Sequence, residues 1–342
     1  MSTGVHSKSA AAANQHADGP RLLADIGGTN ARFGVWYRDA LHAEQVLKCA
    51  DFEGPAAAAT RYLQGLREAN TVPVPRIAAF AVAGPLLEDR IALTNNGWDF
   101  SAAVTRRALK LKQLIFLNDF TALALSVPCL TPGERYQVGG AAPLAHAPIA
   151  VIGPGTGLGV SGLLRADKRW LALQGEGGHV TLPAVEPREM AVVSALHRRY
   201  KHVSAERVLC GDGLELLYST LAELDGATVG KLDAGEITRR ALASEDARCR
   251  ETVQLFCGWL GNVAGNLALT IGARGGVYIG GGIVPRLGEY FAVSPFRPCF
   301  EAKGRFRGFL TAIPAYVITA KYPALIGCVQ AFTNASPRLE AG

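Results

Sequence analysis

Asn118 and Asp119 stand at the end of a short apolar run, residues 114–117, of the kind that fills a buried strand. An ionised carboxylate is costly to bury unless it is paired, so we expect this strand to deliver both polar groups to the rim of a sheet. In α/β folds, ligands bind at the rim formed by the carboxyl ends of the strands. Asp119 could instead cap a helix over residues 121–126. The fragment alone leaves an active-site carboxylate and a helix cap equally open.

Three glycine-rich turns, at residues 27–29, 153–159 and 280–282, each follow a short apolar segment. Glycine lets backbone N–H groups approach a ligand closely, and successive N–H groups in such turns form concave sites for phosphate. Beside the first turn, Asp25 and Thr29 add groups that could hold Mg²⁺ through water and contact a terminal phosphate. Both residue types more usually stabilise the turn itself. None of the turns matches the P-loop or the dinucleotide-binding motif, so phosphate binding and simple strand connection both stay open.

Glu176 and His179 lie three residues apart in a loop that also holds Gly175, Gly177 and Gly178. The glycines keep this loop slim, so a small ligand can come close to both side chains. A lone histidine is more often a structural hydrogen-bonding residue than a ligand contact. The loop by itself therefore indicates a possible polar binding site without deciding its role.

The segments around these residues predict a mixed sheet flanked by helices. A hairpin is expected over 22–36, and further strands over 44–48, 77–82, 114–117, 149–152, 160–164, 277–279 and 317–319. Helices are expected over 55–66, 102–109 with Ser101 as N-cap, 121–126, 187–200, 212–224, 247–269 and 324–332. The turns at 27–29 and 154–156 align, which suggests an internal duplication and predicts the same strand order around both turns.

Two residue patterns inside the predicted helices carry their own expectations. Asp212 and Glu215 have the spacing of a capping box and are expected to open the helix over 212–224. In the long helix over 247–269, Gly258, Gly261 and Gly265 lower helix propensity, so we expect them to allow close packing against a neighbouring element.

The composition is that of a globular protein with room for two domains. The chain has 342 residues, of which 49% are apolar and 19% charged, and no run of about 18 apolar residues predicts a membrane span. Its seven cysteines form no C-x-x-C pair, which favours a reducing, cytoplasmic location and argues against a thiolate zinc site. The net charge of +6 is not concentrated in one block, so no nucleic-acid partner is expected. Residues 1–20 lack an apolar core and are interpreted as a disordered leader.

Six ordered motifs, spread from about residue 21 to residue 330, together resemble those of the bacterial glucokinase family. They are DIGGTNAR at 25–32, LNDFTA at 117–122, GTGLGV at 155–160, GEGGHV at 175–180, SAERVL at 204–209 and GGVYIGGGIVPR at 275–286. The resemblance places the chain in the actin, Hsp70 and hexokinase superfamily. It implies an α/β fold of two domains with duplicated ribonuclease-H-like cores around a central cleft. The small domain would comprise residues 21–129 and 320–342, and the large domain residues 130–319.

The same resemblance implies ATP-dependent phosphorylation of D-glucose to glucose 6-phosphate, the first step of glycolysis, by a homodimer that uses ATP and Mg²⁺. Asp119 would be the general base. The expected sugar contacts are Asn118, Asp119, Glu176, His179 and Glu206, with Asn95 and Asn96 in the same cleft. The expected phosphate and nucleotide contacts are Ala24, Asp25, Ile26, Gly27, Gly28, Thr29, Gly155, Thr156, Gly157, Gly280, Gly281 and Gly282.

Glu206, without the resemblance, could be only an acidic residue in the first turn of a helix. Related sugar kinases use the histidine of Glu-x-Gly-His to bind zinc together with a cysteine-rich run. That run is absent from this chain, so no metal site is expected and His179 should be free to bind sugar hydroxyls.

Three other functions from the same superfamily stay open. A kinase for another hexose would share all these motifs, because sugar discrimination depends on the geometry of a few buried hydrogen bonds. A sugar-sensing regulator would carry an N-terminal helix-turn-helix of several dozen residues, for which the leader is too short. An Hsp70-like or actin-like ATPase needs no sugar site, and Asn118 and Asp119 together with Glu176 and His179 argue against it.

Overall fold

The computed structural model describes residues 19–84, 86, 89–93, 97–333 and 339–340. The expected leader, apart from its last two residues, and Asn95 and Asn96 lie outside these residues. By internal contacts the chain divides into two compact units, one of residues up to Cys129 together with those from Tyr322 onward, the other of Leu130–Lys321.

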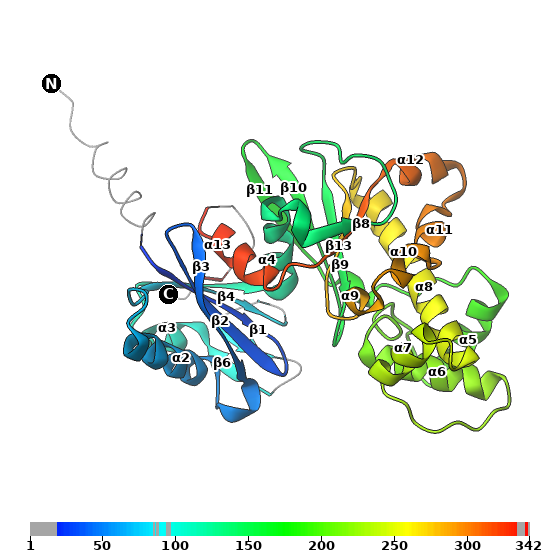
Figure 1. Ribbon diagram of the computed structural model, residues 1–342, viewed down its shortest axis with the longest axis horizontal. Helices are drawn as coiled ribbons and strands as arrows, with labels where there is room; N and C mark the ends of the chain where they lie inside the picture. The colour runs from blue at the N-terminus through cyan, green and yellow to red at the C-terminus, as the bar shows by residue number, and fades with distance from the viewer. Residues whose placement is uncertain (1–18, 85, 87–88, 94–96, 334–338, 341–342) are drawn as a thin grey trace. The chain divides into compact units, whose positions relative to one another are not determined.

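The first unit is built on a six-stranded sheet of order β14-β7-β4-β1-β2-β3 (Figure 1). Strands β1, β4 and β7 are parallel to one another, whereas β2, β3 and β14 each run antiparallel to their neighbours. Their bounds are β1 Arg21–Ile26, β2 Asn30–Tyr37, β3 Ala40–Lys48, β4 Ile77–Val82, β7 Gln113–Asn118 and β14 Leu339–Glu340, and a separate hairpin pairs β5 Arg90–Ala92 with β6 Asp99–Ser101. The strands expected at 22–36, 44–48, 77–82 and 114–117 are therefore confirmed.

Helices cover both faces of this sheet. Helices α2 (Pro55–Ala69) and α3 (Ala102–Ala108) pack on one face, and α4 (Asp119–Ser126) and α13 (Pro323–Gln330) on the other (Figure 1). The alternation of strand side chains explains the two faces: Leu22 of β1 joins the first cluster and Leu23 the second. The expected cap of α3 is confirmed, because the Ser101 side chain accepts a hydrogen bond from the Val104 N–H at 3.1 Å. Single 3-10 turns lie at η1 (Cys49–Asp51) and η2 (Val127–Cys129).

The second unit repeats the same sheet plan. Its sheet has the order β11-β10-β9-β12-β13-β8, with β9, β12 and β13 parallel and β10, β11 and β8 antiparallel to their neighbours. The bounds are β8 Arg135–Gln137, β9 Ile149–Pro154, β10 Leu158–Ala166, β11 Arg169–Gln174, β12 Val277–Ile279 and β13 Ala315–Ile318. The strand order around the turn after β9 therefore equals the order around the turn after β1, as the aligned turns predicted.

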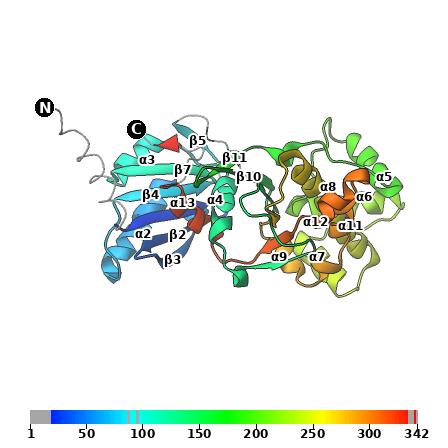
Figure 2. The ribbon, with the colours of Figure 1, turned by 90° about the horizontal axis from the view of Figure 1, so that it is seen from above.

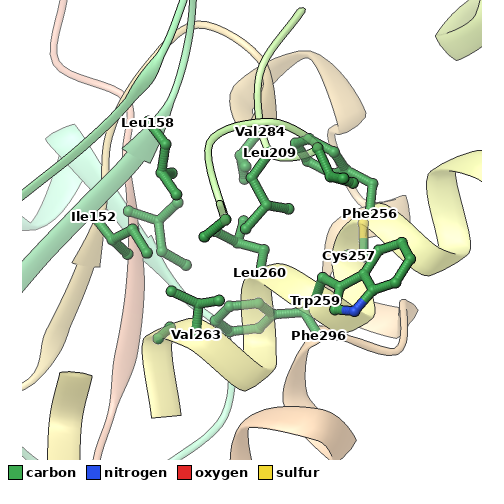
Figure 3. Close-up of a cluster of buried hydrophobic side chains, with 14 of the residues drawn as sticks. Ile152, Leu158, Leu209, Phe256, Cys257, Trp259, Leu260, Val263, Val284 and Phe296 are labelled. Atoms are coloured by element: carbon green, nitrogen blue, oxygen red, sulfur yellow. The ribbon is translucent and has the colours of Figure 1, made fainter. Parts of the chain in front are cut away.

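The helices of the second unit gather at one side of its sheet, around the long helix α8 (Figures 1 and 2). Their bounds are α5 Pro187–His197, α6 Gly211–Leu224, α7 Ala234–Leu242, α8 Ala247–Ile271, α9 Val284–Leu287, α10 Tyr290–Val293, α11 Phe296–Glu301 and α12 Arg307–Ala312, with 3-10 turns η3 Pro132–Glu134, η4 Gly177–His179 and η5 Gly304–Phe306. Figure 3 shows the core they form, in which Trp259 and Leu260 of α8 lie near Phe296 of α11. The Trp259 indole donates to the carbonyl of Pro183 at 2.7 Å, so this large side chain is buried without an unpaired N–H.

The expected close packing is confirmed for two of the three glycines of α8, whereas a Cβ at Gly258 would meet only an ordinary contact, 3.4 Å from Cys299 Sγ. A Cβ at Gly261 would lie 2.1 Å from the carbonyl oxygen of Phe296, and one at Gly265 would lie 2.6 Å from that of Phe300. Both distances are far inside van der Waals contact, so only glycine lets the backbone of α11 approach α8 this closely.

Several expectations about helix ends are wrong, and α2 and α8 extend past their expected ends to Ala69 and Ile271. The N-cap of α6 is Cys210, whose Sγ accepts from the Gly213 N–H at 3.3 Å, so Asp212 lies in the first turn and does not cap. Helix α5 ends at His197, three residues before the expected end. Helix α13 ends at Gln330, two residues before its expected end at residue 332. Of the helices in the described residues, none is both long and apolar enough to cross a membrane.

Candidate active site

In the first unit, strand register brings the first glycine turn and Asn118 to the same sheet edge. Ile26 of β1 pairs with Val82 of β4, which in turn pairs with Asn118 of β7. These strands are parallel, so the turn at 27–29 and Asp119 both follow carboxyl ends, two strand spacings or about 10 Å apart. This is the edge at which ligands bind in α/β sheets.

Asn118, not Asp119, is the N-cap of α4. Its Oδ1 accepts from the N–H groups of Phe120 at 3.0 Å and Thr121 at 3.1 Å, and its Nδ2 donates to the Gly84 carbonyl at 3.3 Å. Asp119 is the first residue of the helix, and its carboxylate oxygen Oδ1 lies 2.9 Å from the Phe120 N–H. The helix-cap interpretation of Asp119 is therefore wrong. Because both lone pairs of the Asn118 amide oxygen are used, Asn118 can offer a ligand only its second N–H.

The first turn presents backbone N–H groups beside Asp25, whose side chain is largely but not fully buried, with 20% of it exposed. The Gly27 N–H donates to the Asn30 carbonyl at 3.0 Å, whereas the N–H groups of Gly28 and Thr29 have no hydrogen-bond partner among the described residues. The Asp25 carboxylate accepts from Arg32 Nη1 at 3.1 Å. Burial raises the pKa of Asp25, and the Arg32 guanidinium partly offsets that effect. An acid held here at such a cost, next to unpaired amides, suits the Mg²⁺ and phosphate of a nucleotide.

Ala24 and Ile26, which flank Asp25 on β1, contribute no side chain to this edge. Both are fully buried in the core cluster under α2 and α3. Only their backbone groups could face a nucleotide.

In the second unit, the other two glycine turns follow adjacent parallel strands. Ile152 of β9 pairs with Ile279 of β12, so the turns after these strands lie at one edge. Gly281 has φ +78°, and a Cβ there would lie 2.2 Å from the carbonyl oxygen of Pro154. The N–H groups of Thr156 and Gly157 have no partner in the part of the chain that the structure describes. The two turns therefore pack against each other and leave amides available to an anion.

His179 and Glu206 lie together beside the second turn. The Glu206 Oε2 accepts from the Leu158 N–H at 2.9 Å, and its Oε1 lies 3.9 Å from His179 Nδ1. The Glu206 N–H donates to the Gly178 carbonyl at 2.8 Å, which fixes the loop that carries His179. Both side chains are partly exposed, His179 at 60% and Glu206 at 34%, so a ligand can reach them.

Gly178 is required for this arrangement, because a Cβ there would lie 2.1 Å from the Leu158 carbonyl oxygen. Glu176 precedes the 3-10 turn η4, and its carbonyl accepts from the His179 N–H at 3.0 Å. Its side chain is exposed, and no hydrogen bond within the described residues holds its carboxylate. The structure thus brings His179 and Glu206 together and leaves the carboxylate of Glu176 unfixed.

A hollow of about 300 Å³ lies in the second unit, next to the third glycine turn. It is mostly apolar, and its lining comprises Leu214, Ala234, Gly235, Thr238, Arg239, Leu242, Ile283 and Arg286. Ile283 directly follows the turn at 280–282. This hollow was not predicted from the sequence, because most of its lining belongs to helix α7, which was not predicted either.

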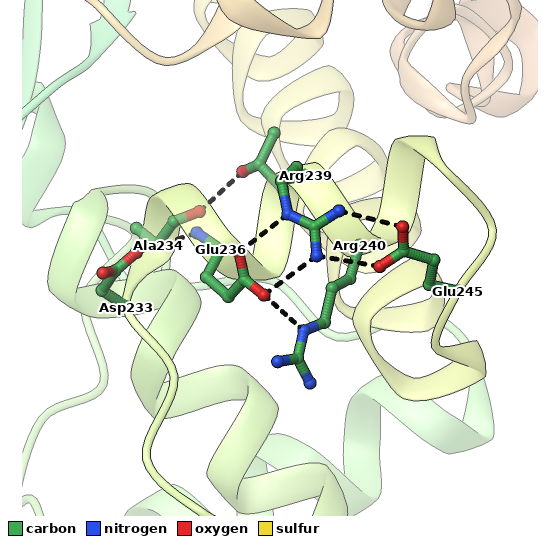
Figure 4. A network of polar contacts seen from close by, with 7 residues as sticks. Asp233, Ala234, Glu236, Arg239, Arg240 and Glu245 are labelled. Atoms are coloured by element: carbon green, nitrogen blue, oxygen red, sulfur yellow. Dashed lines mark hydrogen bonds and ion pairs between the residues drawn. The ribbon is translucent and has the colours of Figure 1, made fainter.

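A charge network at α7 holds one wall of the hollow (Figure 4). Arg239 donates to Glu236 at 2.8 Å and to Glu245 at 2.8 Å, and Arg240 donates to Glu236 at 2.6 Å. Hydrogen bonds from Arg239, and then from Arg240, lower the pKa of Glu236 to about 2. The Arg239 side chain is thereby fixed in place, whereas Arg286 is exposed and forms no ion pair within the described residues.

Comparison with known proteins decides the family. The glucokinase family model matches residues 22–335. The chain belongs to the glucokinase family. It is 52% identical over 318 residues to a glucokinase of Aromatoleum aromaticum, an alignment that covers 92% of this chain and 95% of that protein.

A longer relative and a solved structure also match this chain. The chain is 50% identical to the bifunctional protein glk of Paraburkholderia xenovorans, of which it spans 51%. It thus covers about half the length of such bifunctional relatives and nearly all of the glucokinases. The crystal structure of a glucokinase from an Antarctic psychrotroph has a TM-score of 0.81 at 35% identity and covers 92% of this chain and 99% of that one.

Proposed function

We propose that this protein transfers the γ-phosphoryl group of ATP to the primary hydroxyl of D-glucose. The observation that carries the proposal is the pair of His179 and Glu206 beside a glycine turn with unpaired amides. Such a pair offers hydrogen-bond donors and acceptors to sugar hydroxyls next to a place for phosphate. Membership of the glucokinase family supports the same activity.

Asp119 is assigned as the general base. Its carboxylate takes the proton of the primary hydroxyl, the hydroxyl oxygen forms a bond to the γ-phosphorus, and the bond to the β–γ bridging oxygen breaks to release ADP. This role is supported by the position of Asp119 at the carboxyl end of β7, where the helix cap is supplied by Asn118. Such a base contributes about 10²–10⁴ in rate. Asn118, Glu176, His179 and Glu206 are assigned to the remaining sugar hydroxyls.

The nucleotide contacts are assigned to the glycine turns of both units. The N–H groups of Gly28, Thr29, Thr156 and Gly157 suit phosphate oxygens, because none is used within the described part of the chain. Mg²⁺, held through water by Asp25, would neutralise phosphate charge when bound. The apolar hollow after Gly280–Gly282 has a size that suits a nucleobase, with Arg286 available at its wall.

We also infer the wider organisation from these assignments. Equal strand orders in the two sheets support descent from one duplicated ribonuclease-H-like unit. The two contact-defined units would be the small and large domains of a sugar kinase. A homodimer, a cytoplasmic location and the absence of a bound metal at His179 remain proposals from the sequence.

A coupled assay that follows ADP formation tests the activity. With ATP, glucose should stimulate turnover strongly, whereas mannose, fructose and N-acetylglucosamine should give much lower kcat/KM, because a site built on sugar hydrogen bonds rejects altered hydroxyls. ATP turnover that no sugar changes would refute a sugar kinase. A higher kcat/KM for another hexose would assign the chain to that sugar instead.

A further inference from the structure

Gly155 and Gly157, which lie on either side of Thr156 in the second glycine turn, meet different surroundings. A Cβ added at Gly155 would have nothing within 4 Å, whereas one added at Gly157 would lie 2.5 Å from the Glu206 Oε2. Neither residue has a positive φ, so the backbone conformation does not require glycine at either position. What excludes a side chain at Gly157 is therefore the Glu206 carboxylate.

One oxygen of the Glu206 carboxylate accepts a backbone hydrogen bond, and the other is available to a ligand. Oε2 accepts from the Leu158 N–H at 2.9 Å, directly after Gly157, and Oε1 faces His179 at 3.9 Å. Glu206 lies 48 residues further along the chain than Leu158, so this bond joins the start of β10 to the loop that precedes α6. The bond fixes where Oε1 can meet a ligand.

We infer that Gly157 is a positioning residue for the sugar, acting through Glu206, and not only a phosphate contact. The inference rests on the proposed function, which makes Glu206 a sugar ligand. The missing side chain of Gly157 leaves the space in which the Glu206 carboxylate reaches the Leu158 N–H. A methyl group at position 157 displaces the end of this flexible side chain and breaks that bond without disturbing the backbone.

The expected effect falls on glucose more than on ATP. A displaced carboxylate loses a charge-assisted hydrogen bond to a sugar hydroxyl, which corresponds to about a 10- to 100-fold weaker glucose affinity. The N–H of residue 157 stays in place, so the KM for ATP should change far less.

Gly157→Ala and its matched control Gly155→Ala test this directly. Glucose affinity is measured by isothermal titration without nucleotide, and both KM values are measured in the coupled assay. We expect Gly157→Ala to raise the glucose Kd and KM about 10-fold or more, and Gly155→Ala to leave the glucose Kd, measured without nucleotide, within about twofold. Unchanged melting temperatures would confirm that both variants are folded.

A double-mutant cycle separates positioning from general disturbance. In a Glu206→Ala background, Gly157→Ala should have almost no further effect on glucose affinity, because the group it displaces is gone. Gly157→Ala with normal glucose affinity, or with equal effects in both backgrounds, would overturn the inference. A wild-type protein without glucose-dependent turnover would instead refute the proposed function, so the two failures are distinguishable.

Discussion

Asn118 and Asp119 are adjacent, yet Asn118 caps α4 and Asp119 is the proposed general base, and one experiment can separate these two roles. Asn118 caps α4 through two hydrogen bonds that its Oδ1 accepts, and Asp119 is the first residue of the helix, directly after the carboxyl end of β7. Asp119→Asn keeps the size of the side chain and leaves the cap in place. We therefore expect it to fold normally and to lose activity.

The two residues are expected to affect different quantities, Asp119 the catalytic rate and Asn118 the free energy of unfolding. Loss of the base lowers kcat by about 10²–10⁴, or roughly 3–5 kcal/mol of barrier. Asn118→Ala removes the acceptor for two N–H groups of α4, which costs about 0.5–2 kcal/mol of folding free energy. For a unit of this size each kcal/mol lowers the melting temperature by about 2–4 °C. Asn118→Asp is the matched control, because aspartate caps a helix as well as asparagine does.

The assay pairs thermal unfolding with glucose-dependent ADP formation for each variant. The prediction is a fall in kcat without a fall in melting temperature for Asp119→Asn, and a lowered melting temperature for Asn118→Ala that Asn118→Asp largely restores. Near-normal turnover in Asp119→Asn would remove Asp119 from the base role. A melting temperature that falls as far as in Asn118→Ala would show that Asp119 is structural.

Three further changes probe the nucleotide side and the charge network. Asp25→Asn should keep or raise the melting temperature, because burial raises the pKa of Asp25 and makes its ionised form costly to hold. The same variant should lower kcat/KM for ATP. A clear fall in melting temperature would contradict the stability prediction. Gly281→Ala should lower the free energy of unfolding by about 1–3 kcal/mol, because φ is +78° and the new Cβ would lie 2.2 Å from the Pro154 carbonyl oxygen. An unchanged midpoint of urea unfolding would contradict this prediction. Glu236 has a pKa of about 2 in the folded protein, below its usual value, so its contribution to stability is present above about pH 4.5 and is lost as pH falls toward 2. The melting-temperature difference between wild type and Glu236→Gln should therefore shrink as the pH falls from 7 to 3. A difference that stays constant over this range would contradict the predicted pH dependence.

The sequence predicted those elements whose signals are local. Ser101 before a helical pattern and Pro55 at a first helical position are each readable from a few neighbouring residues. Caps with two candidates were harder. Both Asn118 and Asp119 are good capping residues, and only the backbone geometry shows that Asn118 is extended with ψ 145°.

Contacts between distant segments were beyond the sequence. Cys210 caps α6 with sulfur, a residue type that no capping rule favours. Helix α7 was missed although its signal is local, with Asp233 as N-cap and the buried Ile237 and Ala241 four residues apart. The bond from the Leu158 N–H to Glu206 joins residues 48 positions apart, and no spacing rule predicts it.

The two sheets share a plan but differ in what their strand ends carry. In the first unit, β1 ends next to Asp25 and β7 ends at Asn118, followed by Asp119, so both assigned carboxylates lie at one edge. In the second unit, the corresponding strands β9 and β13 end in Pro154 and Ile318, which carry no carboxylate, and glycine turns follow β9 and β12. Under the proposed assignments, glycine-turn amides of both units bind phosphate, and the first unit adds Asp25 and Asp119, which would hold a metal and take a proton. The shared strand order therefore supports similar positions for the proposed contacts in the two units, and the residues at each strand end decide the chemistry that we propose for them.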